Sequence, residues 1–237
     1  MKHILLAVLL ASTAQAGWLD FIKKPATATN LTALAETDIA AGLKEALAKG
    51  VTKAVTDLGK DGGYLKNLDV KIPMPEKLQS VEKGLRSLGQ DKMADEFVAT
   101  LNHAAEQAVP VAAPIFADAI KQMTIQDAQA ILQGAPDSAT QFFRKTSTPQ
   151  LTEKFLPIVK TATEKTGVTA QYKKLMQAAG PLASLLGKDN ADLDGYVTTK
   201  ALDGLFKMVA AEEKQIRENP VARTSDLLKK VFGSTSK

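Results

Sequence analysis

The segment from Leu101 to Arg144 constrains the fold more than any other part of the sequence. It is rich in alanine and poor in charged residues, and Pro110 and Pro114 interrupt its helical pattern. A helix that is apolar around most of its circumference is buried among other elements. We therefore expect this segment to form central helices against which the others pack. Each proline removes a backbone donor, so a kink or a break is expected there.

Apolar residues recur at three- and four-residue steps over most of the remaining chain, which predicts amphipathic helices. Asp91, Thr124 and Thr148 are the predicted helix caps, and glycines and prolines mark the helix ends. The expected helices are 37–58, 76–88, 91–123, 125–134, 137–147, 149–167, 170–186, 196–219 and 224–233. The turns are short, so we expect an all-α fold, a single-domain bundle of about eight or nine helices.

One short segment, residues 64–75, does not follow the helical pattern. Val70 and Ile72 alternate with charged residues, and Pro73 and Pro75 disfavour helix in the residues before them. The segment is expected to be extended, either as a short edge strand or as a strap across the bundle.

The N-terminus predicts export from the cytoplasm. A short basic start precedes the apolar run Ile4–Leu10, and Ala14-Gln15-Ala16 has the pattern of a signal-peptide cleavage site. We expect a signal peptide at 1–16, a flexible arm at 17–33, a helical domain at 34–233 and a disordered tail at 234–237. Membrane contact is expected only through the arm, by Trp18 and Phe21. Because the chain has no cysteine, it cannot be a lipoprotein, and a periplasmic location is predicted.

Composition argues against several classes of function. The formal net charge of +4 is small and the charges alternate in sign, so no nucleic-acid partner is expected. With no cysteine and only His103 beyond the signal peptide, a zinc site made of nitrogen and sulfur ligands is not expected, and no metal or cofactor is predicted. His103 and Glu106 are one turn apart on a predicted helix and could contact each other.

Loops that bind calcium or phosphate are not predicted. The loop from Asn190 to Gly195 resembles the first half of an EF-hand, but Ala201 occupies the position of the essential glutamate. Helix capping by Asp192 explains this loop better. The glycine-rich stretch from Gly59 to Gly63 lacks the Lys-Ser/Thr pair of a phosphate-binding loop.

Several polar residues lie among apolar neighbours and are the candidate site residues. A buried carboxylate at Glu106 needs a partner, and Arg144, Arg217 or Arg223 could supply it. We favour a structural polar network that ties the helices together over a ligand or catalytic site. The candidates are Asn102, Glu106, Thr140, Arg144, Glu213, Arg217 and Arg223.

Six stretches, in order along the chain, resemble one known family. They are GLKEAL (42–47), LNHAAE (101–106), ILQG (131–134), ATQFFR (139–144), YVTTKALDGLF (196–206) and EEKQIRENPVAR (212–223). The chain is similar over about residues 34–233 to the bacterial domain-of-unknown-function family numbered 4197. The resemblance implies a helical, exported protein of the Gram-negative envelope, and it implies no activity. Members often carry a lipoprotein cysteine after the signal peptide, where this chain has Gly17.

Two functions from different classes remain open. The first is a non-enzymatic envelope protein that binds a protein partner or an apolar ligand between its helices. The alternative is an uncharacterised, hydrolase-like enzyme that uses Glu106 with Arg144 or Arg217, which would require these groups to converge in a solvent-reachable cleft.

Overall fold

The computed structural model describes residues 28–165, 167–180 and 192–218. The predicted signal peptide, Trp18, Phe21, Arg223, the 224–233 helix and the 234–237 tail therefore lie outside the described residues. The chain divides into one unit at Met1–Glu36 and another at Thr37–Lys237. In the first unit only the beginning of one helix is described, and the account below concerns the second.

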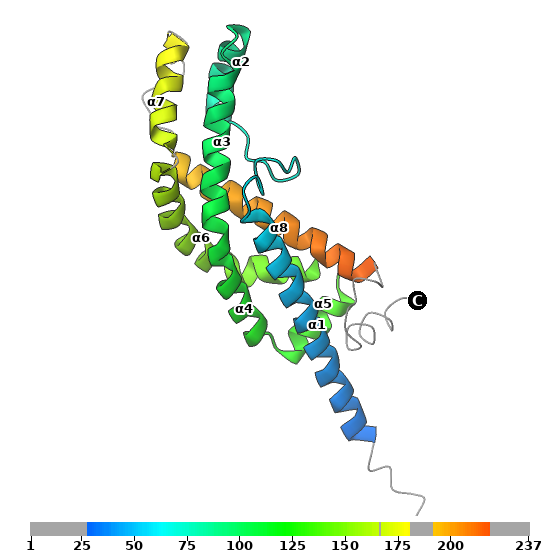
Figure 1. The fold of residues 1–237 in the computed structure, drawn as a ribbon. Helices are drawn as coiled ribbons and strands as arrows, with labels where there is room; N and C mark the ends of the chain where they lie inside the picture. Colours follow the sequence, from blue (N-terminus) through cyan, green and yellow to red (C-terminus); the bar gives the residue numbers. More distant parts are fainter. Residues whose placement is uncertain (1–27, 166, 181–191, 219–237) are drawn as a thin grey trace, which may run out of the picture. The chain divides into compact units, whose positions relative to one another are not determined.

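The described residues are mostly helical, which confirms the all-α prediction, and they contain no strand (Figure 1). The α-helices are α1 (Ala28–Leu58), α2 (Gln79–Ser87), α3 (Asp91–Ala108), α4 (Ala112–Gln122), α5 (Ile125–Gln133), α6 (Ser138–Lys165), α7 (Val168–Ala179) and α8 (Leu193–Glu218). Two 3-10 helices, η2 (Glu76–Leu78) and η3 (Val109–Val111), complete the described elements.

Helices α3, α6 and α8 form the centre of the second unit. Helix α6 packs against α8, α3 and α4, and α3 also packs against α7, α2 and α8. Phe116 lies in the core with its ring edge-on to Phe143 at 5.1 Å and to Phe206 at 6.0 Å, which joins α4, α6 and α8. The predicted apolar stripe of α1, from Leu43 to Leu58, is buried in the same core. The 101–144 segment therefore supplies central helices, as predicted.

The two prolines of the central segment break it into two helices. Helix α3 ends at Ala108, the 3-10 turn η3 contains Pro110, and α4 begins at Ala112. Pro114 then lies in the first turn of α4, where a missing N–H leaves no helical hydrogen bond unmade. The predicted break is confirmed.

Pro149 behaves differently, and the predicted helix start at Thr148-Pro149 is wrong. Helix α6 runs from Ser138 to Lys165 with Pro149 and Pro157 inside it. Both prolines are exposed, whereas the residues at four-residue steps on another face are buried. These buried residues are Phe143, Ser147, Leu151, Phe155 and Val159. Burying each aromatic or aliphatic side chain contributes roughly 1.5–3 kcal/mol, which together exceeds the roughly 3 kcal/mol cost of a proline in a helix.

Other helix ends match the predictions in part. Thr124 accepts a hydrogen bond from the amide of Asp127 and the Asp127 carboxylate accepts one from the Thr124 amide, so the predicted cap of α5 is confirmed. Asp91 is the first residue of α3 and not its cap, which is Gln90. Helix α1 begins at Ala28, before the predicted start near Thr37, and α8 begins at Leu193, before the predicted Tyr196.

Residues 59–75 form the connector between α1 and η2, drawn in cyan and teal in Figure 1. The connector contains no strand: residues 59–66 and 68–70 are turns, and 71–75 have no regular structure. The edge-strand alternative is therefore wrong. Ile72 pairs with a side chain instead of a neighbouring strand, as the next subsection describes.

A search for membrane-spanning segments among the described residues finds no helix with both the length and the apolar character to cross a bilayer.

Candidate functional site

Asn102 holds the connector against α3. Its side chain is fully buried, and its Oδ1 accepts a hydrogen bond from the amide of Ile72 at 2.8 Å. Its Nδ2 donates to the Ile72 carbonyl at 2.8 Å and to the Val98 carbonyl at 2.8 Å. The Asn102 side chain thus hydrogen-bonds to both the amide and the carbonyl of Ile72, which has no neighbouring strand. Without these bonds, the two buried backbone groups would be unsatisfied and would destabilise the fold.

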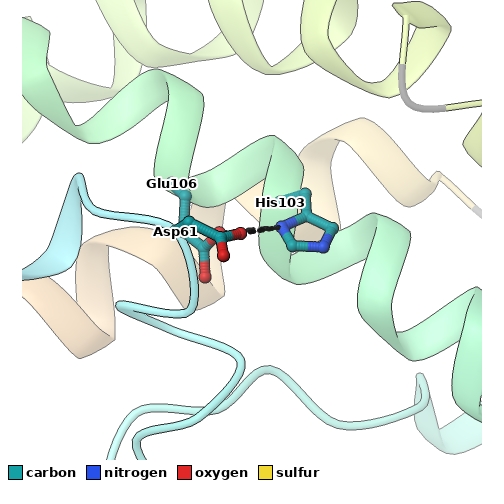
Figure 2. A group of neighbouring side chains, drawn as sticks. All are labelled: Asp61, His103 and Glu106. Atoms are coloured by element: carbon teal, nitrogen blue, oxygen red, sulfur yellow. Dashed lines mark hydrogen bonds and ion pairs between the residues drawn. The ribbon is translucent and has the colours of Figure 1, made fainter.

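Glu106 holds the start of the connector in the same way. Its Oε1 accepts from the amides of Tyr64 and Leu65, each at 3.0 Å, and its Oε2 lies 2.8 Å from Nδ1 of His103 (Figure 2). The Glu106 side chain is only 5% exposed, so these donors replace its lost hydration. The predicted contact between His103 and Glu106 is confirmed.

Glu106 was predicted to pair with an arginine, and this prediction is wrong for the described residues. Among the described residues, neither Arg144 nor Arg217 contacts Glu106, and Arg223 lies outside them. Neutral backbone amides satisfy the carboxylate because the connector passes directly over α3. The enzyme alternative required Glu106 to meet Arg144 or Arg217, and the described structure does not bring these groups together.

Tyr64 links the connector to α8 on its other side. The side chain is fully buried, and its hydroxyl donates to the carbonyl of Ala201 at 2.8 Å. Burial, and secondarily the negative charge of Glu106, raises the pKa of the Tyr64 hydroxyl well above its ordinary value. Lys207 of α8 also donates to the carbonyl of Asp69 at 2.8 Å. The connector is therefore held between α3 and α8.

A second polar cluster lies at the start of α6. Glu213 of α8 accepts hydrogen bonds from the amides of Ala139 and Thr140, each at 2.9 Å, and from the Thr140 hydroxyl at 2.8 Å. The first amides of a helix have no partner within that helix, and they carry partial positive charge. Glu213 therefore caps α6 from another helix.

Arg217 completes this cluster, whereas Arg144 stands apart from it. Arg217 donates to Glu213 Oε1 through Nε at 3.0 Å and Nη2 at 2.8 Å, and Nη2 also donates to the Ile131 carbonyl at 2.8 Å. Arg144 is exposed, and its guanidinium carbon lies 4.5 Å from the centre of the Phe206 ring. Five of the six candidate residues in the described part of the chain thus lie in two clusters, in which they hydrogen-bond to neighbouring side chains or to the backbone. The sixth, Arg144, makes a cation–π contact.

A hollow among the described residues lies elsewhere, between the end of the connector and the start of α8. We call it the α8 groove; its volume is about 540 Å³. Its lining residues are Pro73, Met74, Pro75, Glu76, Lys77, Gln79, Asp192, Leu193, Gly195, Tyr196, Thr199 and Lys200. None of the six predicted site residues that the structure describes lines it. Asn102 acts on it indirectly, because it fixes Ile72 beside the wall formed by Pro73 and Pro75.

Tyr196 and Asp192 shape this groove. The Tyr196 hydroxyl donates to the Pro73 carbonyl at 3.1 Å, which ties the two walls together. Partial burial, and then the charge of Glu76, raises the pKa of Tyr196 above its ordinary value. Asp192 Oδ1 accepts from the Gly195 amide at 2.8 Å, so the predicted capping role of Asp192 is confirmed. Sequence reasoning missed the groove; its signal was the pair Pro73 and Pro75, which fixes an extended wall.

Comparison with known proteins assigns the chain to a family. The family model described as "Protein of unknown function (DUF4197)" matches residues 33–233, so the chain belongs to this family, as its sequence resemblance indicated. No curated protein and no solved structure matches the chain.

Proposed function

We propose that this member of the DUF4197 family is an exported, non-enzymatic envelope protein that binds a small ligand in the α8 groove. The ligand has an apolar body and an anionic end. The observation that carries the proposal is the groove itself, whose volume of about 540 Å³ lies in the range of roughly 300–1,000 Å³ typical of ligand sites.

The lining of the groove supports this class of ligand. Met74, Pro75, Leu193 and Tyr196 give it an apolar floor that is buried or half-buried. An alkyl chain or ring placed there gains about 25 cal/mol for each Å² of apolar surface removed from water.

Charged side chains at the rim favour an anionic end. Lys77 and Lys200 are both exposed and line the groove. Two acids, Glu76 and Asp192, also line the groove and balance the two lysines in number, and the Asp192 carboxylate is directed to the Gly195 amide. A carboxylate or phosphate between the two lysines would have charge-assisted partners.

Export remains part of the proposal and rests on the first 16 residues of the sequence. The basic start, the apolar run and the Ala14-Gln15-Ala16 site support cleavage after Ala16. N-terminal sequencing of the protein from periplasmic extracts tests this point. A mature chain that begins at Met1 would contradict it.

Titration with a fluorescent fatty acid and with its uncharged alcohol analogue tests the binding site. We expect saturable binding of the acid and weaker binding of the alcohol. A Thr199→Trp variant fills the groove from α8 and should abolish binding. Thr152→Trp is the matched control, because Thr152 is an exposed threonine of α6 outside the groove. Equal binding by the wild type and Thr199→Trp would refute the assignment.

The lysines can be tested separately. Lys77→Gln with Lys200→Gln should weaken binding of the acid several-fold and leave the alcohol unaffected, since only the acid carries a charge. Lys92→Gln with Lys154→Gln removes two exposed lysines outside the groove as the control. If both double variants lose the same affinity for the acid, general surface charge and not the groove attracts it.

A further inference from the structure

Three potential metal ligands converge where the connector begins. Asp61 lies in the turn after α1, and His103 and Glu106 lie one turn apart on α3 (Figure 2). One ligand atom from each side chain lies within 4.8 Å of the other two. The sequence lacks the nitrogen and sulfur ligands of a usual zinc site, but the fold adds two carboxylates to the imidazole of His103.

The distances within this cluster suit a small divalent cation. His103 Nδ1 is 2.8 Å from Glu106 Oε2 and 3.8 Å from Asp61 Oδ1. Zinc binds nitrogen and oxygen at about 2.0–2.2 Å in tetrahedral geometry, which places neighbouring ligand atoms about 3.4 Å apart. These two separations lie on either side of this value, and the third, between Asp61 and Glu106, is within 4.8 Å, so a rotation of the exposed Asp61 side chain would complete the geometry.

Glu106 is held in a way that suits a metal ligand. Its Oε1 is occupied by the Tyr64 and Leu65 amides at 3.0 Å, which fixes the plane of the carboxylate. Its Oε2 then faces His103, and the side chain is only 5% exposed. Outer hydrogen bonds that orient a ligand in this way are a regular feature of protein metal sites. The amide pair therefore supplies an orienting shell that lies outside the ligand cluster itself.

The geometry points to a binding site for a zinc-class divalent transition metal ion, formed by Asp61 Oδ1, His103 Nδ1 and Glu106 Oε2. The imidazole nitrogen favours zinc, cobalt or nickel over magnesium and calcium, which prefer ligand sets made only of oxygen. The two carboxylates balance the charge of the ion. Three protein ligands leave a fourth position for water.

Binding of the ion has two local consequences. The ion takes the place of the proton on Nδ1 of His103. It also draws Asp61 away from Lys66, whose Nζ lies 3.7 Å from Asp61 Oδ2. This exposed ion pair contributes little to stability. Ion binding also cross-links the turn after α1 to α3, so it should stabilise the folded state. The site is separate from the α8 groove, and either proposal can fail without the other.

Isothermal titration of the chelator-treated protein with zinc tests the site, in a His3→Gln background that removes the only other histidine. We expect binding of one equivalent, an upward shift of the thermal midpoint, and a shift of the His103 imidazole signals in NMR spectra. Excess magnesium should not displace the zinc.

Asp61→Ala is the decisive variant, because Asp61 is exposed and makes no contact with the connector amides. It should fold normally and lose at least about tenfold in zinc affinity, since losses of about 10–100-fold follow even the removal of outer partners. His103→Gln should lose as much. Asp118→Ala, at an exposed acid of α4, is the control. If Asp61→Ala binds zinc as tightly as the control does, or the wild type binds none, the inference is wrong.

Discussion

Glu106 and Glu213 each bind two consecutive backbone amides that lie far away in the sequence. Glu106 binds residues 41 and 42 positions before it, and Glu213 binds residues 73 and 74 positions before it. Backbone amides satisfy Glu106 without an arginine, whereas Glu213 also binds the guanidinium of Arg217. Both residues thus fix the path of the backbone at the start of another element.

Glu213→Gln tests the helix cap formed from α8. The substitution removes the charge that faces the start of α6, and it removes the ion pair of Glu213 with Arg217, whose side chains are 4% and 18% exposed. Removing one partner of a largely buried pair is costly, so we expect a loss of about 2–4 kcal/mol in the free energy of unfolding, measured by urea titration. Glu153→Gln, at an exposed position of α6, should change it by less than about 0.5 kcal/mol.

Asn102→Leu tests the hold on the connector. A leucine keeps the branching at Cγ but leaves the amide and the carbonyl of Ile72 buried without their partner. Each unsatisfied group costs about 1–3 kcal/mol, so the free energy of unfolding should fall by about 2–4 kcal/mol. Hydrogen exchange at the Ile72 amide should accelerate more than exchange in α6. Uniform acceleration across both would show that Asn102 has no specific hold on the connector.

The burial of several candidate residues could be predicted from the sequence, but most of their partners could not. A polar side chain among alanines signals a buried contact, and Asn102, Glu106 and Glu213 are all buried. A neighbour on the same helix is also predictable, as for His103. A distant backbone amide is not, because it becomes a partner only when the fold places an element end beside the side chain. An arginine was the expected partner because its charge can be read from the sequence. The position of a distant backbone amide cannot be read from the sequence.

At the scale of elements, the different outcomes at Pro114 and Pro149 have a physical reason. The pattern predicted a break at each. Before Pro114 the 3-10 turn η3 separates two α-helices, and the proline occupies the first turn of the second one. At Pro149 the buried residues continue on both sides at four-residue steps, so packing favours one helix. Local signals therefore predicted helix positions well and helix continuity less well.

Gly204→Ala tests the packing of α8 on the connector. A methyl group at residue 204 would lie 2.8 Å from Cε1 of Tyr64 and 3.2 Å from Cβ of Val70. Alanine is favoured over glycine in a helix by about 1 kcal/mol, but overpacking a buried contact costs about 1–3 kcal/mol. We expect a net loss of up to about 2 kcal/mol in urea unfolding, with a change in near-ultraviolet circular dichroism from Tyr64. A gain in stability would mean that the connector moves freely away from α8.

At the scale of the whole molecule, the buried Tyr64 hydroxyl predicts sensitivity to alkali. The folded state raises the pKa of Tyr64, whereas an unfolded tyrosine ionises near pH 10. The stabilising contribution is therefore complete below about pH 10 and is lost as the pH rises further, because only the unfolded chain releases the proton. The same sign holds for Lys53, whose pKa is raised chiefly by its hydrogen bond to Asp57, although Lys53 is exposed and contributes less.

Urea unfolding between about pH 8 and pH 11.5 measures this effect. The free energy of unfolding of the wild type should fall above pH 10 with a slope steeper than that of Tyr64→Phe by up to about 1.4 kcal/mol per pH unit, which is one proton. Parallel slopes for the two proteins would place the alkaline sensitivity in other groups.

The connector also sets the order in which the chain can fold. Its contacts to α8 join residues 137 and 138 positions apart, from Tyr64 to Ala201 and from Asp69 to Lys207. Contacts between such distant residues form late, because the loop between them must close first. Because the chain emerges N-terminus first, from the ribosome or across the inner membrane, the connector cannot reach its final state until α8 has followed. The residues before α8, which make up the first four fifths of the chain, thus remain incompletely folded until that helix is available.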